Sequence, residues 1–238
     1  MAIREAMDTT AVDKVVTALQ QAMFDGILLP GTKLGEEMLS QRFGVSRNTI
    51  REAIRTLMMD GLVSKMPQRS VVVHHLTEAE IEDIFNARLL IESSCVRAAG
   101  HCSDQIIADL VDDFHTYLTK VMTKDDALAA EAHIEIHANF VRRLSKSDWL
   151  AETMRSLMRH LLLIIASVHR SSEDMQLEIE QHRVLCDLLC ARNIEKALAY
   201  LERDLMHTKA FAIKFSYEAL NGVKNTDRLI RPAYWDRQ

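Results

Sequence analysis

Apolar residues near the N-terminus recur at helical spacing in three stretches. The first runs over residues 11–25 and the second over residues 36–43, and each offers one apolar face. Gly44 suits the left-handed position that closes a helix, and Ser46 can cap the start of a third helix. That third helix keeps its apolar residues on one side and ends at Gly61. The pattern therefore predicts three short helices in this part of the chain.

Beyond Gly61 the spacing of apolar residues changes from helical to extended. Two β-rich runs, LVSK and VVVH, flank a polar turn that contains Pro67, Gln68 and Arg69. Three helices followed by a two-stranded hairpin are the elements of a winged helix-turn-helix domain. We assign residues 1–75 to this domain.

From Thr77 onward the pattern is helical throughout and carries no strand signal. Thr77 and Glu80 form a capping-box pair, and Gly100 ends the first of these helices. The predicted helices cover residues 77–100, 103–123, 125–146, 148–170, 173–191 and 193–220. The fold class is therefore mainly α, with an all-helical domain over residues 76–220 and a C-terminal tail over residues 221–238.

Composition agrees with a folded, helix-rich protein. The chain has 238 residues, of which 48% are hydrophobic and 26% charged, a balance typical of globular proteins. Seven Gly and three Pro are few, which favours helices over turn-rich β folds. Four cysteines without a CxxC pair argue against a disulfide scaffold, and no apolar run reaches the roughly 18 residues of a membrane helix. The N-terminus lacks the apolar core of a signal peptide, so we expect a cytoplasmic protein that does not enter a membrane.

Charge is distributed unevenly between the two predicted domains. Residues 1–75 hold nine Lys and Arg against eight Asp and Glu, so the net charge of −5 comes from the remainder. Arg47, Arg51 and Arg55 follow one another at intervals of four, and therefore share the polar side of the third helix. Such a helix can present guanidinium groups to phosphates and to guanine edges. We predict that it binds DNA, the alternative being a merely solvated arginine face.

The stretch LLPGTKLGEEMLSQRFGVSRNTIREAIRTLMMDGLV resembles the DNA-binding domain of GntR-family bacterial transcription regulators. The resemblance covers residues 12–75, and its most specific part is GVSRNTIREAI. It implies that the tip of the wing enters the minor groove of DNA. It also implies that the major groove is contacted by Ser46, Arg47, Asn48, Thr49 and Arg51.

Two departures from the family pattern bear on the DNA contacts. Asn48 stands where threonine is frequent, which can alter base preference. Ser70 stands where a wing glycine is usual, so we expect Arg69 to supply the contact at the wing. Arg42 is assigned either to a phosphate contact or to the protein surface, and both assignments stay open.

The helical remainder resembles the FadR-type C-terminal effector domain, or FCD domain, of the same family over residues 77–215. The resemblance rests on EIEDIFNARLLIESSCVRAA near its start and EQHRVLCDLLCARNIEKALAYLERDL near its end. It implies a ligand-responsive transcription regulator, expected to be a repressor. A homodimer would place two winged helices on the two half-sites of a pseudo-palindromic operator.

One charged pair interrupts the apolar stripe of helix 77–100. Arg88 lies in the middle of this stripe, and Glu92 follows one turn later on the same face. A buried arginine is unfavourable unless it is paired, so an internal Arg88–Glu92 ion pair is one interpretation. In the other, Arg88 points into a cavity and binds an acidic effector, as the matching arginine does in several family members. Both can hold in turn if the effector displaces Glu92.

Four metal-capable side chains fall on the apolar faces of three predicted helices. His133 and His137 are one turn apart inside the apolar stripe of helix 125–146. His182 is surrounded by apolar positions on its own helix, and Asp204 by apolar positions on the last one. For any single one of these residues, an ordinary hydrogen-bonded core position is the alternative. The four together favour a metal site, because a buried Asp204 needs a partner.

The family resemblance sharpens the metal hypothesis. Many members bind a divalent metal through an Asp-x-x-x-His pair and two later histidines. On alignment, the family's Asp falls on His133 and its last His falls on Asp204, so the two ligand types are exchanged. Three imidazoles and one carboxylate suit zinc or nickel as well as manganese or iron, with zinc preferred. An open coordination position would bind the carboxylate of a small effector metabolite beside Arg88.

Two other functions are alternatives to a regulator. A metal-dependent helical-bundle enzyme of the di-iron kind would carry Glu-x-x-His motifs, but no Glu in this chain is followed by His three positions later. P-loop, dinucleotide and G-x-S-x-G motifs are also absent, so we do not expect an enzyme. A purely architectural DNA-binding protein is disfavoured because a structural bundle has no need of buried polar residues.

Overall fold

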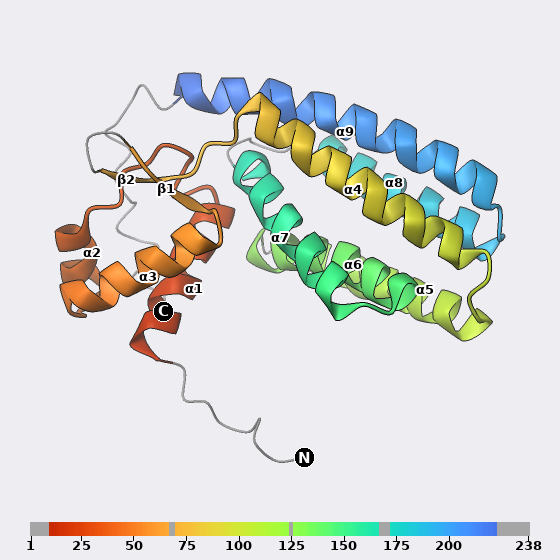
Figure 1. The fold of residues 1–238 in the computed structure, drawn as a ribbon, viewed down its shortest axis with the longest axis horizontal. Helices are drawn as coiled ribbons and strands as arrows, with labels where there is room; N and C mark the ends of the chain where they lie inside the picture. The colour runs from red at the N-terminus through yellow and green to blue at the C-terminus, as the bar shows by residue number, and fades with distance from the viewer. Residues whose placement is uncertain (1–9, 67–69, 124–125, 167–171, 223–238) are drawn as a thin grey trace, which may run out of the picture.

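The computed structural model describes residues 10–66, 70–123, 126–166 and 172–222. The described chain forms an N-terminal domain of helices and a short hairpin, beside a larger domain made of helices alone (Figure 1). The prediction of a mainly α fold is confirmed. Within the described ranges, no helix combines the length and apolar content needed to cross a bilayer.

The N-terminal domain is a winged helix-turn-helix. Ser46 accepts a hydrogen bond from the Thr49 backbone N–H at 3.1 Å and so caps the third helix, as predicted. Gly44 closes the second helix with a φ of +63°, a conformation that favours glycine. In the antiparallel hairpin Val63 lies opposite Val73. The elements are α1 (Ala11–Phe24), α2 (Glu36–Phe43), α3 (Arg47–Met59), β1 (Val63–Lys65) and β2 (Val71–Val73).

The second domain is a helical bundle that begins at the predicted capping box, in which Thr77 and Glu80 bond to each other's backbone N–H. Most predicted helix boundaries differ from the structure by one or two residues, and the largest difference is at the end of one helix. The helix predicted over residues 148–170 ends at Ile165, and the last helix continues two residues past its predicted end at residue 220. Residues 223–238 of the predicted tail lie outside the described residues. The helices are α4 (Glu78–Ala99), α5 (Asp104–Val121), α6 (Asp126–Ser145), α7 (Asp148–Ile165), α8 (Ser172–Cys190) and α9 (Ile194–Gly222).

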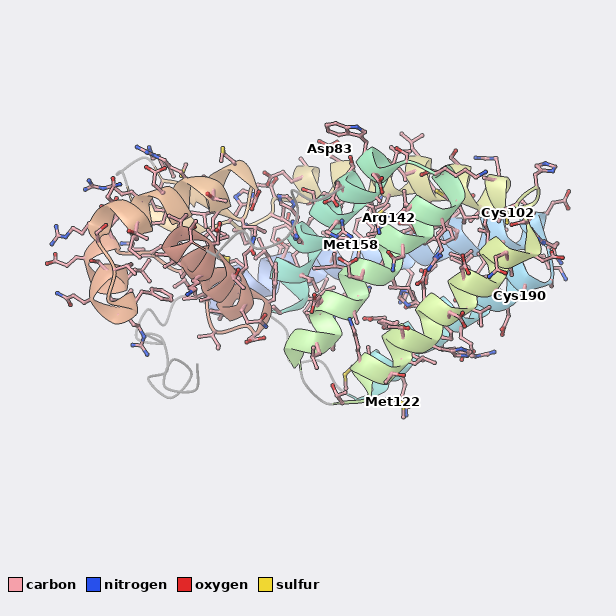
Figure 2. The ribbon with its side chains drawn as sticks, turned by 90° about the horizontal axis from the view of Figure 1, so that it is seen from below. Asp83, Cys102, Met122, Arg142, Met158 and Cys190 are labelled. Atoms are coloured by element: carbon pink, nitrogen blue, oxygen red, sulfur yellow. The ribbon has the colours of Figure 1, made fainter. Side chains whose placement is uncertain are left out.

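The start of α4 and the end of α9 lie together, at the end of the bundle that faces the N-terminal domain (Figure 1). The Ser216 hydroxyl donates to the Leu76 carbonyl at 2.6 Å, and the Tyr217 hydroxyl donates to Glu78 at 2.7 Å. In Figure 2, Cys102 and Cys190 mark the opposite end of the bundle. The bundle therefore has a proximal end, next to the N-terminal domain, and a distal end.

Helix α7 connects the two hydrophobic cores. It runs toward the N-terminal domain and ends against it (Figure 1). Leu163, which is 1% exposed, packs in the core of the N-terminal domain, whereas Leu162 and Ile164 pack in the core of the bundle. A β-carbon on Gly26, whose φ is +68°, would lie 2.3 Å from the Ala166 carbonyl oxygen. The end of α7 therefore contacts the N-terminal domain closely.

Candidate functional site

The exposed face of α3 carries the side chains that the sequence assigned to the major groove. Ser46, Arg47, Asn48 and Arg51 are exposed, and Thr49 is half-buried beside its cap. These residues lie at the start of α3. Their side chains face away from the core because Ile50, Ala53, Ile54 and Leu57 occupy the buried face of the helix.

Both arginines of this face are paired with glutamates at the start of α2. Arg47 lies 2.7 Å from Glu37, and the Arg51 Nε donates to Glu36 at 2.8 Å. All four side chains are more than one-third exposed, so these ion pairs are weak and can open to release the guanidinium groups.

Arg42 and Arg69 are the two remaining candidates for DNA contact. Arg42 is half-buried in the last turn of α2. Arg69, which the sequence analysis places in the turn of the wing, lies outside the described residues, as do Pro67 and Gln68.

A cavity of about 140 Å³ opens inside the bundle, walled by α4, α6, α7, α8 and α9. Every effector and metal candidate from the sequence lines it: Arg88, His133, His137, His182 and Asp204. These residues come from four helices that are distant along the chain, and the packing of the bundle brings them to one cavity.

Three imidazoles converge at the wall of this cavity. His133, His137 and His182 each offer a ring nitrogen, and these nitrogens lie within 4.8 Å of one another. The Nε2 atoms of His137 and His182 are 3.2 Å apart. Two nitrogens bound to one tetrahedral metal at about 2.0–2.1 Å each would be about 3.3 Å apart, so this spacing fits a shared ion.

The surroundings of these imidazoles also suit metal ligation. The Nδ1 of His182 is 2.8 Å from the Glu178 carbonyl oxygen, so it donates there, and the lone pair of Nε2, which faces His137, can act as a ligand. The Nδ1 of His137 lies 3.9 Å from a Glu92 carboxylate oxygen. The pKa of His137 lies well below its ordinary value of 6.5. Burial is the largest cause, and the positive charge of Arg88 is the second. His137 is therefore neutral near pH 7, which is the form that binds metals.

Asp204 lies on the same cavity wall, but its carboxylate is not among the three groups that converge within 4.8 Å. Burial raises the pKa of this carboxyl above its ordinary value, while His182 and Arg88 act in the opposite direction. The structure thus brings three of the four predicted ligands together and leaves the fourth on the adjoining wall. His207, to which the sequence assigned no role, also lines the cavity from an exposed position on α9.

Arg88 takes part in the ion pair that was one of its two interpretations. Its Nε donates to Glu92 Oε1 at 2.8 Å, and both side chains are almost fully buried. The guanidinium also lies over the Phe85 ring, with its central carbon 5.3 Å from the ring centre. Arg88 lines the cavity at the same time, so it can contact a ligand there.

Sequence reasoning missed two residues beside the imidazoles. The buried Tyr117 donates its hydroxyl to Glu178 at 2.6 Å, and Glu178 lies 3.7 Å from the Nδ1 of His133. The signal for Glu178 was its position one turn before His182 on the same helix face. No comparable signal pointed to Tyr117, because α5 reaches the cluster only through packing.

Family comparisons match both domains. Residues 11–73 match the family described as bacterial regulatory proteins, gntR family, and residues 83–207 match the FCD domain. A gluconate operon transcriptional repressor from Bacillus subtilis is 32% identical over 176 residues, which cover 72% of each chain. The HTH-type transcriptional repressor RspR from Escherichia coli K12 is 25% identical over 71% of this chain and 84% of its own.

Solved structures share the fold. A GntR transcriptional regulator from Rhodococcus sp. RHA1 superimposes with a TM-score of 0.72 at 23% identity, covering 85% of this chain and 97% of the other. McbR/YncC from E. coli gives a TM-score of 0.65 at 20% identity, covering 86% and 98%. At these identities the likeness concerns the fold alone.

Proposed function

The chain belongs to the gntR family of bacterial regulatory proteins, with an FCD domain, and from this premise we propose that it is a metal-containing, effector-responsive repressor. It is a DNA-binding transcriptional regulator and not an enzyme, since its family and its relatives are regulators. The alternative of a metal-dependent helical-bundle enzyme is therefore not supported. Two of the relatives are named as repressors, which supports repression over activation. Such a regulator would act in the cytoplasm, where its operator DNA lies.

Operator recognition is assigned to the exposed face at the start of α3. Arg47, Asn48 and Arg51 would contact base edges, with Ser46 and Thr49 beside them, because all belong to the first turns of a helix whose other face is buried. Arg42 and Arg69 would contact the DNA backbone and the minor groove. A homodimer is needed to contact two half-sites of a pseudo-palindromic operator.

Two exposed apolar side chains of the effector domain are candidates for a contact between subunits. Leu90 on α4 is 76% exposed and Trp149 on α7 is 87% exposed, although both are large apolar side chains. Apolar side chains of this size are typical of a contact between subunits.

The observation that carries the metal proposal is the convergence of three imidazoles at one cavity wall. His133, His137 and His182 would hold a divalent ion, with Asp204 as a fourth ligand after a change of side-chain rotamer. Nitrogen-rich ligation favours zinc, with nickel, manganese and iron as alternatives. When bound, the ion supplies an open coordination position for a carboxylate oxygen.

The effector carboxylate would also bind Arg88. In the effector-free state Arg88 is neutralised by Glu92, and an effector carboxylate would compete with Glu92 for the guanidinium. The effector changes DNA affinity only if it binds one arrangement of the two domains better than the other.

Elemental analysis of the full-length protein, purified without an affinity tag, tests the metal site. We expect about one equivalent of a divalent metal per chain, and its loss in a His137→Ala/His182→Ala variant. His101→Ala/His115→Ala removes two exposed histidines outside the cavity and serves as the matched control. Less than a tenth of an equivalent in the wild type after addition of divalent ions, or equal metal in all three proteins, would remove the site.

Operator binding tests the regulatory role. Operator sequences selected from a pool of random DNA should bind the wild type as a two-fold repeat. Small carboxylates should weaken this binding in the wild type but not in Arg88→Met, which should keep its affinity for DNA. If Arg88→Met binds carboxylates as the wild type does, measured by calorimetry, then Arg88 does not bind the effector. Its role would be limited to the ion pair with Glu92.

A further inference from the structure

The cavity is polarised along the axis of the bundle. Because α4 starts and α9 ends at the proximal end, Phe85 lies nearer to the DNA-binding domain than Glu92, and Phe211 lies nearer than Asp204. Helix α7 runs in the proximal direction, so Ile164 lies at the proximal end as well (Figure 1).

Apolar side chains dominate the proximal end of the cavity. Its lining there consists mainly of Phe85, Leu161, Ile164, Ile165, Phe211 and Ala212. The Arg88–Glu92 pair, the three imidazoles and Asp204 follow in the middle of the cavity, where Glu178 and Gln181 line it from α8. A ligand in the proximal half of this cavity therefore meets hydrocarbon at the proximal end and charged groups toward the middle.

The cavity volume limits the size of the ligand. About 140 Å³ is close to the roughly 150 Å³ of an apolar protein cavity that binds one benzene molecule. This volume therefore suits a ligand of about six non-hydrogen atoms. Hydroxyl groups on the part that faces Ile164 and Phe211 would lose their hydrogen bonds to water without replacement, which disfavours a polyhydroxylated body.

We propose that the effector is a small monocarboxylate with an apolar body, whose carboxylate faces Arg88 and the histidines while its body lies against the proximal end of α7. This inference rests on the proposed function, because it specifies the ligand class of the same cavity. It predicts that sugar acids such as gluconate bind this chain more weakly than apolar monocarboxylates of similar length.

This orientation places the apolar body next to the contact between the domains. Ile164 lines the cavity, and its neighbour Leu163 packs in the core of the DNA-binding domain. A body long enough to press on Ile164 therefore acts one residue away from that core. Longer carboxylates should weaken operator binding more than short ones at equal saturation.

A homologous series of carboxylates tests the proposal. Acetate, propanoate, butanoate, pentanoate, gluconate and pentan-1-ol are titrated by calorimetry into the full-length, metal-loaded protein. We expect Kd to fall about fourfold for each added methylene, because each is buried against hydrocarbon. Gluconate and pentan-1-ol should each bind at least tenfold more weakly than pentanoate, since one lacks an apolar body and the other lacks the carboxylate.

Two outcomes separate this inference from the proposed function. If Kd does not change from acetate to pentanoate, or if gluconate binds more tightly than pentanoate, the proposed ligand class is wrong. The proposal of a carboxylate-sensing regulator would still stand. Failure of every carboxylate to bind the metal-loaded protein overturns both. In a Phe211→Asn variant the gain per methylene should shrink for butanoate and pentanoate while acetate binds as in the wild type. The wild-type series alone decides the matter if that variant does not fold.

Discussion

The imidazole of His160 lies against the backbone of Gly61, so closely that a β-carbon on this glycine would come within 2.4 Å of the ring Nε2. The ring is held in place by its Nδ1, which is 2.7 Å from the Ser156 carbonyl oxygen one turn earlier on α7. Gly61 lies between α3 and β1, so the helix that lines the cavity also contacts the chain at the end of the helix assigned to DNA. This contact joins the helix that lines the cavity to the chain just after the C-terminal end of α3.

Replacing Gly61 with alanine tests this contact, and Gly44→Ala is its matched control. Both glycines have positive φ, +72° and +63°, so each substitution should cost about 1–2 kcal/mol of backbone strain. A β-carbon at Gly44 meets nothing within 4 Å, whereas one at Gly61 meets His160. We therefore expect Gly61→Ala to lower the free energy of unfolding by roughly 1 kcal/mol more, measured in urea. Equal losses in the two variants would mean that the contact contributes nothing.

Removing Arg47 should weaken operator binding. Arg47→Ala is expected to lose about 1–3 kcal/mol at a specific operator and to relax base preference, because a guanidinium that contacts a base edge is lost. Arg183→Ala removes an equally charged, exposed arginine of α8 and controls for net charge. The measurement is fluorescence anisotropy at one salt concentration. Unchanged affinity and selectivity in Arg47→Ala would show that this face does not read DNA.

Removing the glutamate that pairs with Arg47 should have the opposite effect. Glu37→Gln frees the guanidinium and removes a negative charge beside the DNA phosphates, so operator affinity should rise about 1.5- to 5-fold, the range of an exposed ion pair. Glu180→Gln, which breaks a similar exposed pair with Arg183 on the effector domain, should leave the affinity unchanged. A weaker operator complex in Glu37→Gln would assign this glutamate a positive role in binding.

The ion pair between Glu135 on α6 and Arg155 on α7 predicts a loss of stability in acid. The hydrogen bond from Arg155 is the largest influence on this carboxyl and lowers its pKa below the ordinary value of 4.5. The stabilisation is therefore complete above pH 4.5 and is lost as the pH falls through the lowered pKa. Glu135→Gln should lower the free energy of unfolding by about 1 kcal/mol at pH 7 and have little effect at pH 3. A double-mutant cycle with Arg155→Met isolates the pair, and a coupling energy equal at both pH values would contradict the assignment.

Asp204 decides whether the metal site has three or four protein ligands. Asp204→Asn should weaken zinc binding by at least about tenfold if the carboxylate joins the imidazoles, as judged by competition with a zinc chelator. Asp187→Asn removes an exposed carboxylate of α8 and is the control. Equal zinc affinity in wild type and Asp204→Asn would leave a three-histidine site. Asp204 would then be a cavity residue that faces the effector instead.

The sequence by itself determined the features that depend on neighbours within about one helical turn. The caps at Ser46 and Thr77 and the left-handed Gly44 could be predicted because each makes its decisive contacts within three or four residues. Helical periodicity also placed His133 and His137 on a buried face. Their convergence with His182 is what the family pattern led us to expect, and in the bundle the imidazoles of α6 and α8 meet at one cavity wall.

Tertiary structure alone decided which remote side chains meet. Leu163 packs in the core of the N-terminal domain although its neighbours Leu162 and Ile164 pack in the core of the bundle, because the two domains cover different sides of the end of α7. Tyr117 reaches the imidazoles, and Asp204 stops short of them, for the same reason: both outcomes depend on how helices far apart in sequence are placed against one another. Local periodicity fixes the face on which a side chain lies but leaves open the neighbour that covers that face, which depends on the packing of the whole chain.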